Sequence, residues 1–294
     1  MKSGTVAIVG RPNVGKSTLI NTLIKEKIAI VSNKPQTTRT RILGVLHRPD
    51  AEILFLDTPG IHQQQDRLNR RMVRVASESL QEADLIYVLA DATSLPGPGE
   101  RLVKQRVAEV IGADGPPVFL LLNKVDLVNR AKLLPIIDVY SKVLPWAEMV
   151  PISAKTGINV EKLIELTVQA LPEGDPAFGE DTFTDQTMRT LAAELIREKI
   201  LHKTWEELPY GVAVTIDEFK EEGKLARITA TIFVSKKSHK PMIIGKGGNL
   251  LKEMATEARK EMEQIFGMKV FLQLWVKVEE SWRDDDSMLV DLGY

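Results

Sequence analysis

The first segment of this chain that could do chemistry combines two glycines with a lysine and a serine. It comprises Gly10, Arg11, Pro12, Asn13, Val14, Gly15, Lys16 and Ser17. An apolar run precedes it and a helix-like stretch follows, which is the setting in which such a segment cradles phosphate groups. The glycines let backbone N–H groups converge on an anion at the start of a helix. Lys16 then adds a positive charge, and the Ser17 hydroxyl can bind Mg²⁺.

A second segment supplies a carboxylate and another glycine. It follows the apolar run 53–56 and comprises Asp57, Thr58, Pro59 and Gly60, and Ile61 after it is also predicted to contact GTP. Asp57 is predicted to lie in the Mg²⁺ shell, and Gly60 lets its N–H approach a γ phosphate. A second Mg²⁺ hydroxyl is expected from the segment 36–39, where we choose Thr38 and keep Thr37 as the alternative. The predicted Mg²⁺ ligands are Ser17, Thr38 and Asp57, and the predicted catalytic residues are Lys16, Thr38 and Gly60.

Two further segments could read the base. Asn123, Lys124, Val125 and Asp126 follow the apolar run 118–122, so they belong at the carboxyl end of a buried parallel strand, where ligands bind in such sheets. A carboxylate at Asp126 can accept both N–H donors of guanine, a pair that adenine lacks. Asn123 can tie this loop to the phosphate loop, and the Lys124 stem can lie along the base. Ser153, Ala154 and Lys155 follow a short strand, and the Ala154 N–H is predicted to reach guanine O6.

The elements that position these residues alternate between apolar runs and helical patterns from residue 5 to about 171. This alternation predicts a mostly parallel sheet covered on both faces. The run 42–46 is expected to pair antiparallel with the next strand, because too few residues separate the two for a crossover helix. Strands are expected at 5–9, 42–46, 53–56, 85–90, 118–122 and 149–152, and helices at 16–25, 68–82, 99–111, 130–143 and 159–171.

The stretch 172–184 is rich in proline and glycine, which predicts a linker. The pattern of apolar residues after it differs from that of the first domain. The order of elements after the linker is that of a type II KH fold. It comprises a helix within 185–203, two alternating strands, a glycine loop, a second helix and a last strand. The loop and its flank supply candidate RNA contacts, because glycines at a helix N-terminus let an RNA backbone approach. These contacts are Lys236, Lys237, Lys240, Ile243, Ile244, Gly245, Lys246, Gly247 and Gly248, with His239 nearby.

Aromatic side chains and the tail of this second half leave two further expectations. Phe233, Phe271 and Trp275 are interpreted as core residues and not as stacking surfaces, because they fall on strands of a small domain. The stripe on the second helix is expected to run from Leu250 to Ile265. The acidic segment 282–294 could pack as a closing strand or turn, or stay mobile, and the sequence leaves these alternatives open.

Composition limits the classes of protein that fit. The 294 residues suggest two domains, predicted at 1–171 and 185–294 with the linker 172–184 between them. The chain has no cysteine, which excludes disulfides and thiolate sites, and the four histidines have no metal-ligand spacing. We expect neither a signal peptide nor a membrane span. The net charge is −1, and residues 176–294 carry about 17 Lys and Arg against 21 Asp and Glu, so RNA binding must use a local patch.

The order GRPNVGKS, QTTR, DTPG, NKVD and SAK, followed by the KH pattern, resembles the Era family of GTPases over essentially the whole chain. The resemblance implies an α/β P-loop GTPase domain with a mixed, mostly parallel sheet and a smaller α+β type II KH domain. It implies binding of GTP or GDP with Mg²⁺, and binding of the 3′ region of 16S ribosomal RNA during maturation of the small (30S) subunit. It also implies a cytoplasmic monomer that associates peripherally with the inner face of the membrane in some cells. The alternative is a GTPase switch whose second domain docks to a protein or a membrane.

Ile61 stands where Ras-like proteins have a water-positioning glutamine, and an isoleucine cannot orient a nucleophile. We therefore predict slow intrinsic hydrolysis. Gln63, Gln64 and Gln65 are nearby but are interpreted as polar loop residues. In GTPases that resemble this one around the first glycine loop, an asparagine such as Asn13 helps to hold a potassium ion. K⁺ is therefore a further candidate cofactor, against the alternative that Asn13 only shapes the loop.

Overall fold

The structure is a computed structural model that describes residues 1–61, 66–111 and 115–294. It divides into two compact units that are not continuous in sequence. The first comprises Met1–Ala29, Thr38–Gln64 and Arg70–Asp185, and the second comprises Ile30–Thr37, Gln65–Asn69 and Gln186–Tyr294. Gln63, Gln64 and Gln65, on which one prediction falls, lie outside the described residues.

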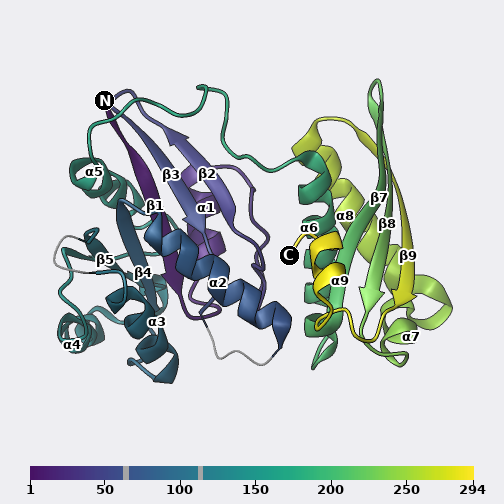
Figure 1. Cartoon of the computed structure of the whole chain (residues 1–294), viewed down its shortest axis with the longest axis horizontal. Coiled ribbons are helices and arrows are strands. Elements are labelled where there is room, and N and C mark those ends of the chain that lie inside the picture. Colours follow the sequence, from purple (N-terminus) through teal and green to yellow (C-terminus); the bar gives the residue numbers. More distant parts are fainter. Residues whose placement is uncertain (62–65, 112–114) are drawn as a thin grey trace. The chain divides into compact units, whose positions relative to one another are not determined.

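The first unit is built on a six-stranded sheet with the order β2-β3-β1-β4-β5-β6 (Figure 1). All neighbouring strands pair in parallel except β2 and β3, which pair antiparallel as the short spacing between them predicts. The strands are β1 (Lys2–Gly10), β2 (Ile42–His47), β3 (Ala51–Asp57), β4 (Leu85–Asp91), β5 (Val118–Asn123) and β6 (Glu148–Pro151).

Helices cover both faces of this sheet, and successive strand residues alternate between two cores. Val6 and Ile8 of β1 pack with α1 and α5, whereas Ala7 and Val9 pack with α2, α3 and α4 on the other face (Figure 1). These alternating side chains make the central strands apolar on both sides. The helices are α1 (Lys16–Ile24), α2 (Arg67–Gln81), α3 (Pro98–Ala108), α4 (Arg130–Ser141) and α5 (Val160–Ala170).

The second unit contains a three-stranded sheet with the order β7-β8-β9. β7 and β8 form an antiparallel hairpin, and β9 pairs in parallel with β8. The inward residues of all three strands pack against α6 and α8, which form the core with them (Figure 1). The elements are α6 (Met188–Lys203), β7 (Val212–Glu222), β8 (Leu225–Val234), α7 (His239–Ile244), α8 (Asn249–Phe266), β9 (Lys269–Val278) and α9 (Asp286–Asp291).

This is the type II KH arrangement that the order of elements predicts, with three differences in detail. The short helix α7 precedes the glycine loop and was not predicted, because its six residues carry no helical apolar period. The apolar stripe of α8 ends on Phe266, which is buried, whereas Ile265 is exposed. In the tail, the Trp282 ring is completely buried and α9 follows it, so this segment packs as a closing helix.

The interpretation of the sheet aromatics as core residues is wrong. Phe271 and Trp275 of β9 are 52% and 57% exposed, and Phe233 of β8 is half-buried. Their positions alternate with the inward Val270, Leu272, Leu274 and Val276, so the rings must lie on the opposite face of the sheet. The alternation of residues along a strand does not reveal which face of the sheet the helices cover. The three rings were assigned to the core because they are hydrophobic side chains on strands, and that assignment placed them on the wrong face.

Two short segments from the N-terminal half belong to the second unit, where α6 and the C-terminal segment hold them. The Val31 N–H donates to Glu198 Oε1 at 2.9 Å, and His202 Nε2 hydrogen-bonds the Val31 carbonyl oxygen at 2.8 Å. The buried Arg197 guanidinium donates to the Thr37 carbonyl oxygen. In the segment 66–69, Asp66 pairs with Arg283 at 2.9 Å. The segment that contains Thr37 is therefore part of the second unit, whereas Thr38 belongs to the first.

Candidate functional site

The first glycine loop joins the end of β1 to the start of α1, as predicted. Gly15 adopts a φ of 102°, and a Cβ there would lie 2.3 Å from Asn123 Nδ2. A Cβ on Gly10 would lie 2.6 Å from the Leu89 carbonyl oxygen. Both positions therefore require glycine, for the backbone conformation in one case and for close approach in both. No side chain caps the N-terminus of α1, which leaves its first amides to bind an anion.

Lys16 lies buried inside this loop, and no carboxylate of the described residues is at hydrogen-bond distance from its ammonium. Its ammonium donates to the carbonyl oxygens of Gly10 and Arg11, both at 3.2 Å. Burial lowers the pKa of Lys16 to about 8, although the nearby charge of Asp57 opposes the shift. An anionic phosphate beside this ammonium would restore the missing counter-charge. The position therefore fits the predicted contact with the β and γ phosphates.

Three oxygen-bearing side chains converge beside Lys16. Ser17 Oγ lies 2.7 Å from Asp57 Oδ2 and 2.8 Å from Thr38 Oγ1. Thr37 Oγ1 instead donates to the Lys34 carbonyl oxygen at 2.6 Å, so the geometry favours Thr38 over its neighbour. Burial raises the pKa of Asp57 to about 6, against the lowering effects of Lys16 and of the hydroxyls.

Within the described residues, the other carboxylate oxygen of Asp57 is buried and has no hydrogen-bond partner. An unpartnered carboxylate oxygen beside two hydroxyls is the set of hard oxygen donors that Mg²⁺ takes. The residues present therefore fit a Mg²⁺ ion, with Ser17, Thr38 and Asp57 as the side chains that would hold it. Its charge would also offset the cost of burying the Asp57 carboxylate.

The segment after Asp57 explains why Ile61 has no place in the chemistry. The Ile61 side chain is buried in the core, and its N–H donates to the Gly10 carbonyl oxygen at 3.2 Å. A Cβ on Gly60 would lie 2.9 Å from Pro12 N, so only glycine lets this segment approach the phosphate loop so closely. Ile61 therefore fixes the segment to the protein, and it cannot orient a water molecule.

The predicted tie between the base loop and the phosphate loop is present. Asn123 Nδ2 donates to the Val14 carbonyl oxygen at 2.7 Å, and Asn123 Oδ1 accepts from the Ala154 N–H at 2.9 Å. The second bond revises one prediction, because the Ala154 amide is already used and is not available to guanine O6. The next amide along the chain, that of Lys155, makes no hydrogen bond within the described residues. The Asp126 side chain is exposed at the end of this loop.

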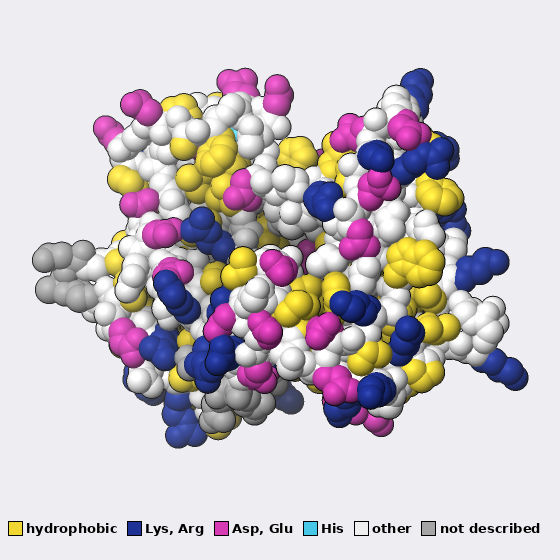
Figure 2. Space-filling view, turned by 45° about the vertical axis from the view of Figure 1, so that its right-hand side comes forward, with side chains coloured by type: hydrophobic (Ala, Val, Ile, Leu, Met, Phe, Trp, Pro, Cys, Tyr) yellow, Lys and Arg dark blue, Asp and Glu magenta, His cyan; other side chains and the backbone are white. Residues whose placement is uncertain are grey.

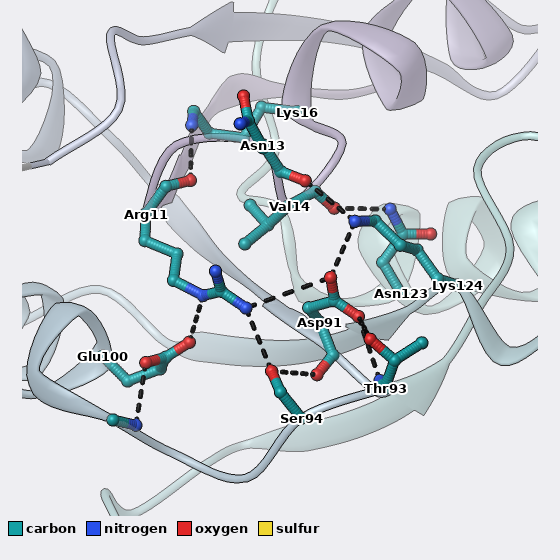
Figure 3. Close-up of polar contacts among 11 residues, drawn as sticks. Arg11, Asn13, Val14, Lys16, Asp91, Thr93, Ser94, Glu100, Asn123 and Lys124 are labelled. Atoms are coloured by element: carbon teal, nitrogen blue, oxygen red, sulfur yellow. Dashed lines mark hydrogen bonds and ion pairs between the residues drawn. The ribbon is translucent and has the colours of Figure 1, made fainter. Parts of the chain in front are cut away.

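A network of charges below the two loops was not predicted (Figure 3). Lys124 Nζ donates to Asp91 Oδ2 at 2.7 Å and to the Asn13 carbonyl oxygen at 2.9 Å. Burial would raise the pKa of Asp91, but hydrogen bonds from Lys124 and Thr93 outweigh it and hold that pKa below its usual value. Asp91 therefore links the base loop to the phosphate loop through one ammonium group.

Arg11 extends this network towards α3. Its guanidinium donates to Glu100 and, at 3.0 Å, to Ser94 Oγ, while Glu100 Oε2 accepts from the Gly97 N–H at 2.9 Å (Figure 3). The Arg11 side chain is therefore directed towards α3, and only its backbone remains to contact a nucleotide. One signal in the sequence could have revealed Asp91. It ends an apolar strand as Asn123 does, and the two residues are paired across β4 and β5.

The second glycine loop joins α7 to α8. Gly245, Gly247 and Gly248 all have positive φ, and a Cβ on Gly245 would lie 2.6 Å from Leu250 Cβ. The Lys246 side chain is exposed at the tip of the loop, directly before the N-terminus of α8. The loop therefore presents backbone amides and a cation together, which suits a phosphodiester backbone.

The other predicted RNA contacts divide into exposed and buried residues. Lys236, Lys237 and Lys240 are exposed, and Ile244 is half-buried. Ile243 and His239 are buried, so they support α7 from beneath and cannot contact RNA directly. Figure 2 shows Lys and Arg side chains interspersed with Asp and Glu on the face in view, and Lys236 and Lys237 are themselves paired with Glu207 and Glu280.

Family comparisons agree with both sites. A model of the 50S ribosome-binding GTPase family matches residues 5–124, and a KH domain model matches residues 207–283. The GTPase Era of Ruminiclostridium cellulolyticum is 47% identical over the whole of this chain and 97% of its own. The GTPase Era of Geobacter metallireducens is 48% identical, again over the whole of this chain and 98% of its own.

Two similar crystal structures contain ligands. A variant of Aquifex aeolicus Era bound to GDP and AlF₄⁻ superposes with a TM-score of 0.95 at 43% identity, over 100% of this chain and 99% of the other. Era in complex with MgGDPNP and nucleotides 1506–1542 of 16S ribosomal RNA superposes with a TM-score of 0.96 at 44% identity, with the same coverage. With a P-loop GTPase domain followed by a type II KH domain, and with this similarity over its full length, the chain belongs to the Era family of GTPases and is a GTP hydrolase.

Proposed function

We propose that this GTPase is a switch that binds the 3′ region of 16S ribosomal RNA through its KH domain and acts in assembly of the 30S subunit. The observation that carries the proposal is the second glycine loop, whose positive-φ glycines and exposed Lys246 stand at the N-terminus of α8. The similar Era that was crystallised with nucleotides 1506–1542 supports this choice of RNA. We assign residues 1–171 to the GTPase domain, 172–184 to the linker and 185–294 to the KH domain.

The side chains of the first unit position GTP for attack by water. Lys16 and the loop amides would hold the β and γ phosphates, and Gly60 would bring its N–H to the γ phosphate. Bound Mg²⁺ neutralises negative charge on the phosphates, and Ser17, Thr38 and Asp57 would hold it. No side chain near Gly60 within the described residues replaces the missing glutamine, since Ile61 is buried. We therefore infer slow hydrolysis, which suits a timer better than a metabolic enzyme.

We infer that nucleotide state and RNA affinity are coupled through the segment 30–38. Thr38 is the candidate Mg²⁺ ligand, whereas the carbonyl of Thr37 is held by Arg197 of α6. A change at Thr38 on hydrolysis must be transmitted along the chain to a segment that belongs to the second unit. Coupling of this kind is reciprocal, so RNA must change nucleotide affinity by the same factor.

RNA binding is tested by placing negative charge in the second glycine loop. Replacing both Lys246→Asp and Gly247→Asp removes a cation and adds charge and bulk where phosphates would approach. We expect almost complete loss of binding to the 1506–1542 fragment in an electrophoretic or anisotropy titration. GDP affinity should stay unchanged, because the two substitutions lie in the other unit. Equal RNA affinity in mutant and wild-type protein would exclude the KH loop as the binding site.

We also propose that K⁺ assists hydrolysis beside Asn13. The asparagine has a positive φ of 65° in the phosphate loop, and a cation there would neutralise charge that develops in the transition state. Hydrolysis should be faster in KCl than in NaCl at equal ionic strength, and Asn13→Ala should remove the difference while GTP binding persists. Identical rates in the two salts would leave the catalytic element to be supplied by the ribosomal partner.

We propose that the protein acts in the cytoplasm, where it binds the 30S subunit as a monomer. Among the described residues, no helix combines the length and the apolar character that crossing a membrane requires. Peripheral association with the inner face of the membrane stays a prediction that rests on the family resemblance alone.

A further inference from the structure

The outer face of the KH sheet carries aromatic side chains, two of which are more than half exposed. The inward residues of β8 and β9 are buried against α6 and α8, while the alternate residues point to the other side of the sheet. We call this half of the outer side the aromatic face. It consists of Arg227, Thr229, Thr231 and Phe233 on β8 and Lys269, Phe271, Gln273, Trp275 and Lys277 on β9.

Two rings on β9 are more than half exposed. Phe271 and Trp275 lie four residues apart on one strand, about 13 Å between their Cα atoms at the usual rise of a strand. The two rings therefore cannot stack on the same base, and each can take a base of its own. Within the described residues, the Trp275 ring has no aromatic or cationic partner. Exposed aromatic residues at such spacing are unusual on a surface with no binding role.

Cations stand beside the other rings of this face. The Arg227 guanidinium lies 5.6 Å from the centre of the Phe271 ring, and the Lys277 ammonium lies 5.6 Å from that of Phe233. The acidic partners of Arg227, Lys277 and Lys269 are Glu222, Glu279 and Glu263, and all three lie outside the aromatic face. The three cations are exposed, and ion pairs of exposed cations are weak enough to be exchanged for phosphate contacts.

The aromatic face contains three cations, and its acidic neighbours lie at its border. Thr231 donates to Asp217 Oδ2 of β7 at 2.7 Å, and Glu218 of β7 is paired with Thr229. Flat rings flanked by cations and hydroxyl or amide groups are the composition of surfaces that bind single-stranded nucleic acid. The exposed rings, which can stack on bases, favour RNA over an acidic protein surface or a second copy of the chain.

The aromatic face shares the strand β9 with α7 and α8, the two helices that flank the glycine loop. β9 is an edge strand, and its inward side packs against α8, whose N-terminus carries the loop. A KH loop clamps about four nucleotides. A longer RNA that leaves the loop across the edge formed by β9 would reach Trp275 and Phe271 next.

We propose that the aromatic face is a second RNA contact, on which unpaired nucleotides that flank the loop-bound segment stack on Trp275 and Phe271. The proposal rests on RNA binding by the KH domain and extends the binding site beyond the glycine loop. It makes Trp275 and Phe271 contributors to affinity for long RNA and leaves binding of the shortest RNA to the loop.

The test compares Trp275→Ala and Phe271→Ala with the wild-type protein on the 1506–1542 fragment of 16S ribosomal RNA and on pieces shortened from each end. Stacking on one ring should be worth about fivefold or more in affinity. We expect each variant to lose at least that factor on the full fragment and nothing on the shortest piece that still binds. Trp275→Phe should restore most of the affinity, because a phenyl ring can still stack.

Exposed apolar residues elsewhere provide matched controls. Phe183→Ala and Leu134→Ala remove similarly exposed side chains of the first unit and should leave RNA affinity unchanged. Protection of Trp275 from oxidation by N-bromosuccinimide when the fragment is added would locate the contact directly. Equal affinity of the Trp275→Ala, Phe271→Ala and wild-type proteins for the full fragment would overturn the proposal.

The outcomes separate this proposal from RNA binding by the loop. In one outcome, the doubly substituted Lys246→Asp, Gly247→Asp protein loses RNA binding while Trp275→Ala has no effect. That result would support the glycine loop as an RNA-binding site and reject the aromatic face as one. A change of oligomeric state in Trp275→Ala, measured by light scattering, without a change in RNA affinity would assign the face to contact between copies and reject RNA. Binding of the wild-type protein to none of the RNA pieces would reject the function itself.

Discussion

Asp126 is the residue on which the choice of base should depend. Its carboxylate is exposed at the end of the base loop, where it can accept two N–H groups of guanine. Asp126→Asn replaces one acceptor by a donor and should cost roughly 2–4 kcal/mol in GTP binding, because one guanine N–H then faces a donor in place of its acceptor. Competition among GTP, ATP and XTP measures the preference, and XTP should gain relative to GTP. A mutant that still strongly prefers GTP would show that another residue reads the base.

Asp91 should matter for nucleotide binding although it touches no nucleotide. Its carboxylate positions Lys124 against the phosphate loop, so Asp91→Asn should weaken GDP binding by roughly 1–2 kcal/mol, or about 5- to 30-fold. The measurement is the dissociation rate of a fluorescent GDP analogue.

Two further variants distinguish this role from a general loss of charge. Asp91→Asn should add little to the effect of Lys124→Met, because both changes break the same link. Glu78→Gln removes a carboxylate from an exposed ion pair with Arg74 and should leave the rate unchanged. Additive effects of the Asp91 and Lys124 changes would contradict the positioning role.

At the scale of elements, the packing of α1 on β2 depends on a missing side chain. A Cβ on Gly44 would lie 2.8 Å from Ile28 Cδ1 and 2.9 Å from Ile24 Cγ1. Gly44→Ala should therefore overpack this core and lower the free energy of unfolding of the first unit by about 1–3 kcal/mol.

Thermal unfolding with and without GDP checks this prediction, because GDP identifies the transition of the unit that binds it. Gly179→Ala is the control, since its Cβ would meet only Thr182 Oγ1, at 4.0 Å. That control should change stability by less than about 0.5 kcal/mol. Equal melting temperatures for Gly44→Ala and Gly179→Ala would show that the isoleucines move aside freely.

Sequence patterns predicted those elements whose residues carry a local signal. The apolar runs before Gly10, Asp57 and Asn123 located the strands that carry the nucleotide loops, because a buried parallel strand needs an unbroken apolar run. The short connection between β2 and β3 was enough to predict that the two strands pair antiparallel. Such signals reside within a few neighbouring residues.

The features that sequence reasoning missed depend on residues far apart in the chain. Asp91 meets Lys124 only because β4 and β5 are neighbours in the sheet. The Ala154 amide turns to Asn123 because two strand ends meet there. Trp275 looks like a core residue until the helices are known to cover the opposite face of its strand. Each of these requires the sheet order before the side chain can be interpreted.

At the scale of the whole molecule, nucleotide state should control RNA affinity through the segments 30–37 and 66–69. Lys34→Ala removes a contact with the Thr204 carbonyl oxygen, and Asp66→Asn breaks the ion pair with Arg283. In each variant, the ratio of RNA affinities measured with GDP and with a non-hydrolysable GTP analogue should move towards one. The affinity for nucleotide alone should change little.

Matched controls keep this prediction testable. Arg74 lies on the exposed side of α2, so Arg74→Ala should preserve the wild-type ratio of the two RNA affinities. A ratio that stays at the wild-type value in both Lys34→Ala and Asp66→Asn would mean that the second unit does not sense the nucleotide through these segments.

The membership of residues 30–37 in the second unit also has a consequence for the order of folding during synthesis. Thr37 leaves the ribosome 160 residues ahead of Arg197, the side chain that will hold its carbonyl. At about 5–20 residues per second, this segment waits roughly 8–30 s before α6 has been made. The nascent GTPase domain therefore completes its sheet with this segment still unattached, and only synthesis of α6 provides the side chain that holds it.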